Sequence, residues 1–212
     1  MKKTDWPEVF QPLIKKYRGR KHPLDYQNRY QLTVSVILSA QDSDKHINEI
    51  APDFFSAYPS MKELATAEPA DLYPYLSKVR NFGNKCKWLT KLAKTLGTDE
   101  QIPSTMEKLT ELSGIGRKSA NVIIRESGGE AEGIIVDLHV VRVAPRLGVA
   151  VGDKPDKIEK QLMESLPKKM WGEVGMAISF LGREICRPTN PKCEDCVMNA
   201  SCVYFNSEIK GK

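Results

Sequence analysis

No part of this 212-residue sequence is apolar over the roughly 18 residues that a membrane-spanning helix needs. The first residues, Met1-Lys2-Lys3-Thr4-Asp5-Trp6, lead into charged sequence and lack the hydrophobic core of a secretion signal. Glycine and proline, at 14 and 13 residues, are too few for a collagen-like or low-complexity chain. From these absences we expect a protein that is neither membrane-spanning, exported nor fibrous, with one or two globular domains.

Charge is nearly balanced, so no strongly acidic or basic character dominates the chain. Lys and Arg total 32 against 27 Asp and Glu, a formal net charge of +5. This small positive excess is compatible with a polyanionic partner but does not require one.

A pattern of alternating strand residues is also missing, as is any internal repeat, whereas helical periodicity runs through the chain. Residues 30–40 are largely apolar and predict a buried helix, with a buried strand as the competing interpretation. Ser-x-x-Glu capping boxes predict short helices starting at Ser60 and Ser104. The remaining expected helices lie near 9–19, 89–97, 117–127, 137–147, 155–165 and 171–185. The sequence therefore predicts an all-α fold.

Cysteine is scarce outside one short segment. Cys86 stands alone within an expected helix, where it fits a small buried side chain. The other four have six, two and five residues between them: Cys186, Cys193, Cys196 and Cys202. In a chain without an export signal, this grouping indicates a metal site rather than disulfides. Spacing alone leaves zinc and an iron–sulfur cluster open, because zinc sites usually have two Cys-x-x-Cys pairs and this segment has one.

A Gly-x-Gly turn between two expected helices is the most informative local feature. Gly114-Ile115-Gly116 separates a helix that ends near Leu112 from one that begins near Arg117. The first N–H groups of the second helix and its macrodipole favour an anion such as a nucleic-acid phosphate. Lys118 lies in the first turn, where the dipole disfavours an ammonium ion and favours the neutral, nucleophilic amine. A tight turn followed by an exposed lysine is the simpler alternative.

Nineteen positions after Lys118, an apolar run leads into Asp137 at the expected start of another helix. The simplest interpretation of Asp137 is an N-cap, a position that aspartate often occupies. Arg142 and Arg146 lie four residues apart on that helix and fit either phosphate contacts or a solvated face. His139 fits a hydrogen-bonding side chain better than a metal ligand.

In order and spacing, these motifs resemble those of endonuclease III, a DNA glycosylase/AP lyase family of the helix-hairpin-helix, Gly-Pro-Asp superfamily. The resemblance covers residues 5 to 205. The motifs that carry it are Leu38-Ser39-Ala40-Gln41 with Asp44, the hairpin from Leu112 to Ala120, Val136-Asp137-x-His139-Val140-x-Arg142, and the four-cysteine segment.

The resemblance implies a two-domain helix-hairpin-helix glycosylase fold with a C-terminal iron–sulfur loop. Residues 23–131 would form a six-helix domain with the hairpin, and residues 1–22 with 132–212 a second helical domain that carries the cluster. DNA would lie across the cleft between the domains. The four clustered cysteines would hold one [4Fe–4S] cluster per chain.

The resemblance also implies roles for individual residues. Lys118 would be the catalytic lysine and Asp137 the catalytic aspartate, while Gln41 would enter the DNA stack where the damaged nucleotide has left. The other residues that it places at the DNA are Asp44, Arg80, Asn81, Phe82, Gly114, Ile115, Gly116, Arg117, His139 and Arg142. A monovalent cation would assist the hairpin in holding a backbone phosphate.

The implied activity is base excision repair of oxidised pyrimidines. The damaged base leaves as Lys118 forms a Schiff base with the sugar, and β-elimination then cuts the strand 3′ to the abasic site. The implied partner is double-stranded DNA with damaged bases or abasic sites, and the implied protein is a monomer without a membrane partner. We expect a cytoplasmic location, nucleoid-associated in a bacterium.

Several positions depart from the family's usual pattern. Asp42-Ser43 replaces threonine or alanine after Gln41, which predicts an extra negative charge near DNA. Ser113 replaces a frequent proline in the hairpin, and Leu138 replaces a frequent threonine. The segment from Val79 to Phe82 replaces a glycine followed by an apolar wedge residue, so either a polar Asn81 or Phe82 would supply the second inserted group.

Three other activities compete with this one. An adenine-mismatch glycosylase normally lacks the catalytic lysine and carries a long extra C-terminal domain, so Lys118 and the chain length argue against it. A uracil or thymine-mismatch glycosylase stays open, because pocket residues are not identifiable from the sequence. A non-catalytic, cluster-stabilised DNA-binding module would not require Lys118 and Asp137 together.

Overall fold

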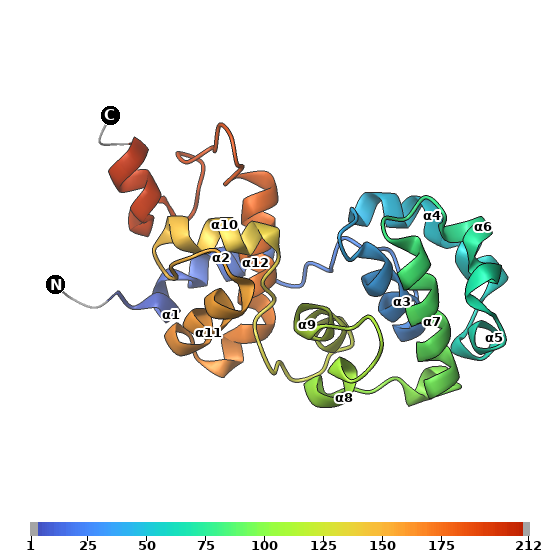
Figure 1. The fold of residues 1–212 in the computed structure, drawn as a ribbon. Coiled ribbons are helices and arrows are strands. Elements are labelled where there is room, and N and C mark those ends of the chain that lie inside the picture. Colours follow the sequence, from blue (N-terminus) through green and yellow to red (C-terminus); the bar gives the residue numbers. More distant parts are fainter. Residues whose placement is uncertain (1–3, 210–212) are drawn as a thin grey trace. The chain divides into compact units, whose positions relative to one another are not determined.

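The computed structural model describes residues 4–209, which form helices and no β-strand (Figure 1). The all-α class predicted from periodicity is confirmed. Contacts between Cα atoms divide the chain into two compact units. One is Lys21–Gly129, and the other combines the N-terminal residues up to Arg20 with the chain from Glu130 onward. Within the described residues, no helix is both long and apolar enough to cross a membrane.

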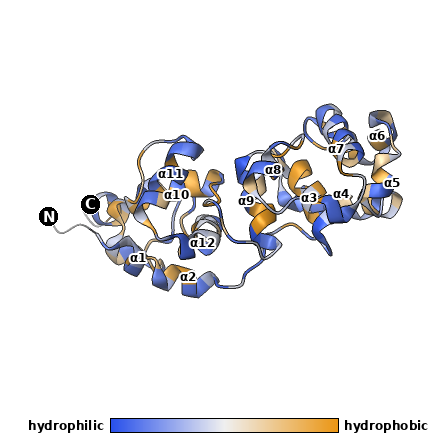
Figure 2. Ribbon diagram, turned by 90° about the horizontal axis from the view of Figure 1, so that it is seen from below, coloured by the Kyte–Doolittle hydropathy of each residue, from blue (hydrophilic) through white to orange (hydrophobic). Residues whose placement is uncertain are grey.

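The unit Lys21–Gly129 is built around α3 (Arg29–Ser39). Nine of the eleven residues of α3 are buried, and it packs against α4, α7 and α9, so it forms the centre of this core. Figure 2 accordingly shows α3 as strongly hydrophobic. The surrounding helices are α4 (Asp44–Ala57), α5 (Met61–Ala65), α6 (Tyr73–Leu76), α7 (Phe82–Leu96), α8 (Met106–Thr110) and α9 (Arg117–Glu126), with 3-10 turns at Pro69–Leu72 and Asp99–Gln101.

The other unit is built around α12 (Trp171–Glu184), which packs against α2 and α10. Gly182 permits the close approach of α10, because a Cβ atom there would lie 2.8 Å from the Cβ of His139. The remaining elements are α1 (Trp6–Val9), α2 (Gln11–Tyr17), α10 (Leu138–Leu147) and α11 (Pro155–Ser165), 3-10 turns at Lys168–Met170 and Asn199–Ser201, and a π turn at Phe205–Ile209.

Helix ends follow local chemistry at most predicted positions. The Ser60 hydroxyl caps α5, and Gly97 ends α7 with a φ of 74°, both as predicted. The predicted cap at Ser104 is displaced, because α8 begins at Met106 with Thr105 in the N-cap position. Residues 30–40 form a helix, and the competing strand interpretation is wrong.

Helix α4 was not predicted. Ile47, Ala51 and Phe54 form its buried stripe, but Pro52 stands inside it and normally breaks a helix. Asn48, one turn before the proline, uses its side chain to accept from Asp25 N and to donate to the carbonyl of Pro23. These tertiary hydrogen bonds and the buried stripe stabilise a helix that local propensity disfavours.

Candidate active site

The two glycines of the hairpin meet different structural requirements. Gly114 has a φ of 82°, and a Cβ atom on it would lie 3.2 Å from both Ile37 Cγ2 and Trp88 Cβ. The fold therefore requires glycine at 114. Gly116, the N-cap residue of α9, has an ordinary extended conformation, and a Cβ atom on it would meet nothing within 4 Å. Packing within the protein does not require glycine at 116.

Lys118 is the second residue of α9, as the sequence predicted, and its side chain is half-buried. The apolar face of α9 is buried through Ala120, Val122, Ile123 and Ile124. The buried face anchors α9 in the core, and the start of the helix at Gly116 and Arg117 stays exposed. The first N–H groups of an α-helix have no acceptor within the helix, so this end suits an anion.

Asp137 is the N-cap of α10, which confirms the structural part of its interpretation. Its Oδ1 accepts hydrogen bonds from His139 N at 2.8 Å and Val140 N at 2.9 Å. Its Oδ2 accepts from Ser179 Oγ at 2.6 Å and lies 3.7 Å from the guanidinium of Arg183. The carboxylate side chain is 12% exposed. These four partners are donors or cations, and they stabilise an ionised, oriented carboxylate.

Ser179 and Arg183 were missed from the sequence. They lie one turn apart on α12, where Arg183 Nε donates to Ser179 Oγ at 3.4 Å. A serine within the buried run Met176–Gly182 is the signal that could have indicated a polar partner, because a buried hydroxyl normally forms a hydrogen bond.

His139 and Arg142, both predicted at the DNA, have contacts within their own unit. The Arg142 guanidinium donates to the carbonyls of Gly182 at 2.9 Å and Cys186 at 3.2 Å, and lies 3.3 Å from His139 Nδ1. Burial lowers the pKa of Arg142 from its ordinary value. These bonds join α10 to the end of α12 and the first cysteine, so Arg142 has a structural role, and its DNA contact stays a prediction.

The residues predicted to enter or flank the DNA stack come from two loops of the unit Lys21–Gly129. Gln41 lies between α3 and α4, with Asp44 as the first residue of α4. Arg80 and Asn81 precede α7, and Phe82 is its first residue. Asn81 is exposed, whereas Phe82 is half-buried and packs edge-on against Tyr73, with ring centroids 5.2 Å apart.

Asp42, expected to add a negative charge near DNA, is held by groups of the protein, and its place near DNA stays a prediction. Its side chain is 12% exposed, and its carboxylate accepts hydrogen bonds from the backbone N–H groups of Arg80 and Ser43 and from the His46 ring. The charge is therefore used to hold protein groups together.

The four C-terminal cysteines lie near one another in a segment attached to α10. Cys202 Sγ donates to the carbonyl of Arg146 at 3.3 Å, and Arg146 Nη1 donates to Cys186 Sγ at 3.5 Å. Burial raises the pKa of the Cys196 thiol, and the neighbouring thiols Cys202, Cys186 and Cys193 raise it further. Among the described residues, no three His, Cys, Asp or Glu side chains converge around a single-ion position.

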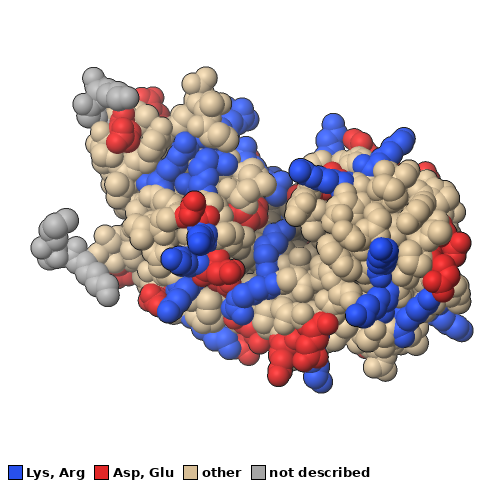
Figure 3. Space-filling model, viewed as in Figure 1, with Lys and Arg blue, Asp and Glu red and all other residues tan. Residues whose placement is uncertain are grey.

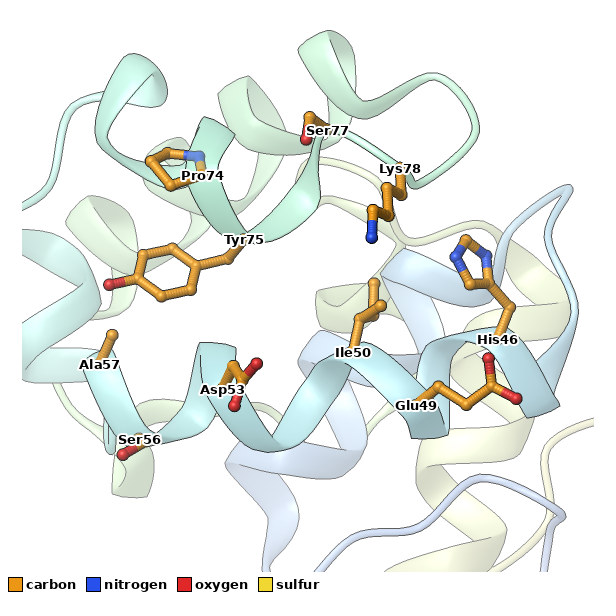
Figure 4. Close-up of a pocket in the computed structure, with 10 residues that line it drawn as sticks. All are labelled: His46, Glu49, Ile50, Asp53, Ser56, Ala57, Pro74, Tyr75, Ser77 and Lys78. Carbon is orange, nitrogen blue, oxygen red and sulfur yellow. The ribbon is translucent and has the colours of Figure 1, made fainter.

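A cavity of about 860 Å³ lies between α4 and the segment that includes α6. Figure 4 shows Glu49 and Asp53 on α4 opposite Tyr75 and Lys78. Neither Lys118 nor Asp137 lines it. On the face seen in Figure 3, Lys and Arg side chains gather in patches between acidic ones, in keeping with the small net positive charge.

Comparison with known proteins agrees with these features. The family model described as HhH-GPD superfamily base excision DNA repair protein matches residues 34–168. Endonuclease III of Synechocystis sp. is 34% identical over 203 residues, which cover 95% of this chain and 93% of that protein. A structure of a non-covalent endonuclease III–DNA complex has a TM-score of 0.85 at 27% identity and covers 96% of both chains. A trapped endonuclease III–DNA covalent intermediate has a TM-score of 0.84 at 28% identity, covering 94% of this chain and 95% of that one. The chain therefore belongs to the HhH-GPD superfamily of base excision DNA repair proteins, within which it is a member of the endonuclease III family.

Proposed function

We propose that the protein is a bifunctional DNA glycosylase/AP lyase that removes oxidised pyrimidines from double-stranded DNA and cleaves the strand 3′ to the abasic site. The observation that carries the proposal is the held carboxylate of Asp137. An N-cap needs only one acceptor oxygen, and Oδ1 already accepts from two N–H groups. The second oxygen has its own hydroxyl donor and a nearby guanidinium, which suits a carboxylate that must remain ionised.

Lys118 is the proposed nucleophile. It follows the hairpin by two residues and lies in the first turn of α9. A DNA phosphate at the hairpin would place the sugar of the damaged nucleotide within reach of the amine. Gly116 supports a phosphate contact at the hairpin, because packing within the protein does not require glycine there. A Cβ atom at this position would instead obstruct an approaching DNA backbone.

The proposed reaction begins with extrusion of the damaged nucleotide, because its glycosidic bond is inaccessible inside the stack. The neutral amine of Lys118 attacks C1′, and the C1′–N bond breaks, with the electron pair leaving on the base. Asp137 stabilises the positive charge that develops on the sugar. The nitrogen loses a proton and its lone pair breaks the C1′–O4′ bond, the ring oxygen takes up a proton to become a hydroxyl, and a protonated imine remains. Removal of a C2′ proton then expels the 3′ phosphate by β-elimination.

Lys118 and Asp137, the two proposed catalytic residues, belong to different compact units. The hairpin-bearing domain, residues 23–131, supplies the nucleophile, and the domain of residues 1–22 with 132–212 supplies the carboxylate.

The four clustered cysteines suit a [4Fe–4S] cluster. The donor set is all sulfur, and thiolates are the ligands that iron–sulfur clusters take. We propose that Cys186, Cys193, Cys196 and Cys202 hold one cluster per chain. When bound, the cluster crosslinks the loop and has no step in hydrolysis or elimination. Arg187 and Lys192 of that loop are proposed to contact phosphate.

A panel of duplexes tests the proposed substrate class. Thymine glycol, dihydrouracil, uracil and an abasic site are placed in the same sequence, and base release is followed separately from strand cleavage. We expect release of the two oxidised or saturated pyrimidines and cleavage at the abasic site. Release of uracil alone would favour the mismatch-glycosylase alternative, and binding without release or cleavage would favour the non-catalytic module.

A further inference from the structure

Two loops of the unit Lys21–Gly129 each carry a residue with a positive φ, a backbone conformation that residues other than glycine rarely adopt. Gln41, between α3 and α4, has a φ of 61°, and Asn81, just before α7, has a φ of 59°. A non-glycine residue in this region is strained and persists only where surrounding contacts fix it. The contacts that fix these two loops therefore indicate how their exposed side chains are held.

Asp42 joins the two loops directly. Its Oδ2 accepts from Arg80 N at 2.9 Å, while Oδ1 accepts from Ser43 N at 2.8 Å and from His46 Nδ1 at 2.9 Å. Burial acts to raise the pKa of Asp42, but these hydrogen bonds outweigh burial and hold the pKa below its ordinary value. The ionised carboxylate of Asp42, the residue after Gln41, is thus bonded to the backbone of Arg80, the residue before Asn81.

Lys85 anchors the start of the loop that carries Gln41. Its ammonium is buried and donates to the carbonyls of Leu38 at 2.7 Å and Ala40 at 2.6 Å. Carbonyls at a helix C-terminus have no partner within the helix, so a cation at this end stabilises it. The chain is therefore anchored at the residue before Gln41, and the Asp42 carboxylate anchors it at the residue after.

The two exposed side chains at these positions are both carboxamides. Gln41 and Asn81 are exposed, and Asn81 Oδ1 accepts from Asn84 Nδ2 at 2.9 Å. The ring of Phe82, in contrast, is partly covered by its edge-on contact with the Tyr73 ring. A carboxamide carries a donor and an acceptor and can hydrogen-bond to the edge of an unpaired base.

We propose that Asp42 is a positioning residue that holds Gln41 and Asn81 as one two-amide reader of the base opposite the extruded nucleotide. The inference rests on the proposed DNA function but does not require catalysis. Loss of the Asp42 carboxylate leaves Arg80 N–H and His46 without their acceptor, so the two loops separate and the amides lose their common geometry. Preference among opposite bases should then weaken, while general attraction to DNA persists.

The test measures equilibrium binding to a duplex with an uncleavable tetrahydrofuran abasic site opposite each of the four bases. The variants are Asp42→Ala, Asp42→Asn, Asn81→Ala and the double variant Asp42→Ala/Asn81→Ala. Asp53→Asn is the matched control, because it removes an exposed carboxylate from α4, the helix that follows Asp42, without touching either loop. Thermal unfolding identifies a temperature at which every variant is folded.

We expect the parent to bind the four duplexes with affinities that span about tenfold or more, and Asp42→Ala to reduce that span to about twofold. Asn81→Ala should reduce the span to the same extent. The double variant should show the same span of affinities as either single variant, because the two residues act as one unit. Asp42→Asn, which keeps one acceptor oxygen, should be intermediate, and Asp53→Asn should match the parent.

A parent without opposite-base preference, an Asp42→Ala variant that keeps the parent's ranking, or effects of Asp42→Ala and Asn81→Ala that simply add would each overturn the inference. A parent that shows the preference but never releases a base or cleaves an abasic site would overturn the proposed activity and leave the reader intact.

Discussion

Ser179 Oγ donates a 2.6 Å hydrogen bond to Asp137 Oδ2 across 42 residues of sequence. It ties the start of α10 to the middle of α12 within one compact unit. Because Oδ1 is held by the backbone of α10, the Ser179 bond fixes the rotation of the carboxylate as well as its charge. The relationship gives the candidate catalytic aspartate a defined orientation before any DNA is bound.

Ser179→Ala should slow base release about tenfold. A hydrogen bond to a charged group contributes about 1.5–3 kcal/mol, and we expect only part of this free energy to stabilise the transition state relative to the bound substrate. Single-turnover base release under saturating enzyme measures the change. Ser35→Ala is the control, since Ser35 Oγ is buried and is without a hydrogen-bond partner in the described part of the chain. Equal rates for Ser179→Ala and Ser35→Ala would show that orientation of Asp137 does not depend on Ser179.

Asp137→Asn separates the capping role of this residue from its charge. Asparagine is also a good N-cap, so we expect the free energy of unfolding to change by no more than about 1 kcal/mol. Base release should fall by several orders of magnitude, with each tenfold loss equal to about 1.4 kcal/mol of barrier. Urea unfolding and single-turnover kinetics test the two parts. A variant that releases base at the parent's rate would reduce Asp137 to a cap.

The two hairpin glycines should respond differently to alanine. Gly114→Ala meets both a positive φ and side-chain atoms at 3.2 Å, so it should lower the free energy of unfolding by more than about 1 kcal/mol. Gly116→Ala should leave unfolding nearly unchanged and weaken binding to an abasic-site duplex. Urea unfolding and fluorescence anisotropy measure the two effects. Normal DNA binding by Gly116→Ala would contradict a phosphate contact at this hairpin.

Cysteine replacement tests the cluster. Purified protein should be yellow-brown, absorb at about 400 nm and contain roughly four iron atoms per chain. Cys193→Ser should lose iron and solubility, because the loop then lacks one ligand of its crosslink. Cys86→Ser should keep the colour, since Cys86 is fully buried within α7. Colourless protein with a single zinc ion would contradict the iron–sulfur assignment but not the glycosylase.

Local chemistry made some of these features predictable from the sequence. The cap at Asp137, the end of α7 at Gly97 and the start of α9 after Gly116 depend on residues within one or two turns of each other. Helix α4 was missed because Pro52 opposes it locally, while the stabilising contacts come from Pro23 and Asp25.

Other features depend on packing between distant segments. The Ser179 partner of Asp137 is 42 residues away, and the Arg80 N–H that binds Asp42 is 38 residues away. No periodicity or motif indicates such pairs. For Asp42, the position after Gln41 predicts a negative charge but not the hydrogen-bond partners that leave its side chain only 12% exposed.

Borohydride trapping on abasic-site DNA tests the central claim most directly, because it reports a covalent bond between one amine and the sugar. The parent should form a stable enzyme–DNA adduct that incorporates one duplex per chain. Lys118→Gln should form none while it still binds the same duplex, and peptide mapping of the parent adduct should place the DNA on Lys118. Undiminished trapping by Lys118→Gln, or an adduct that maps to another amine, would contradict the account.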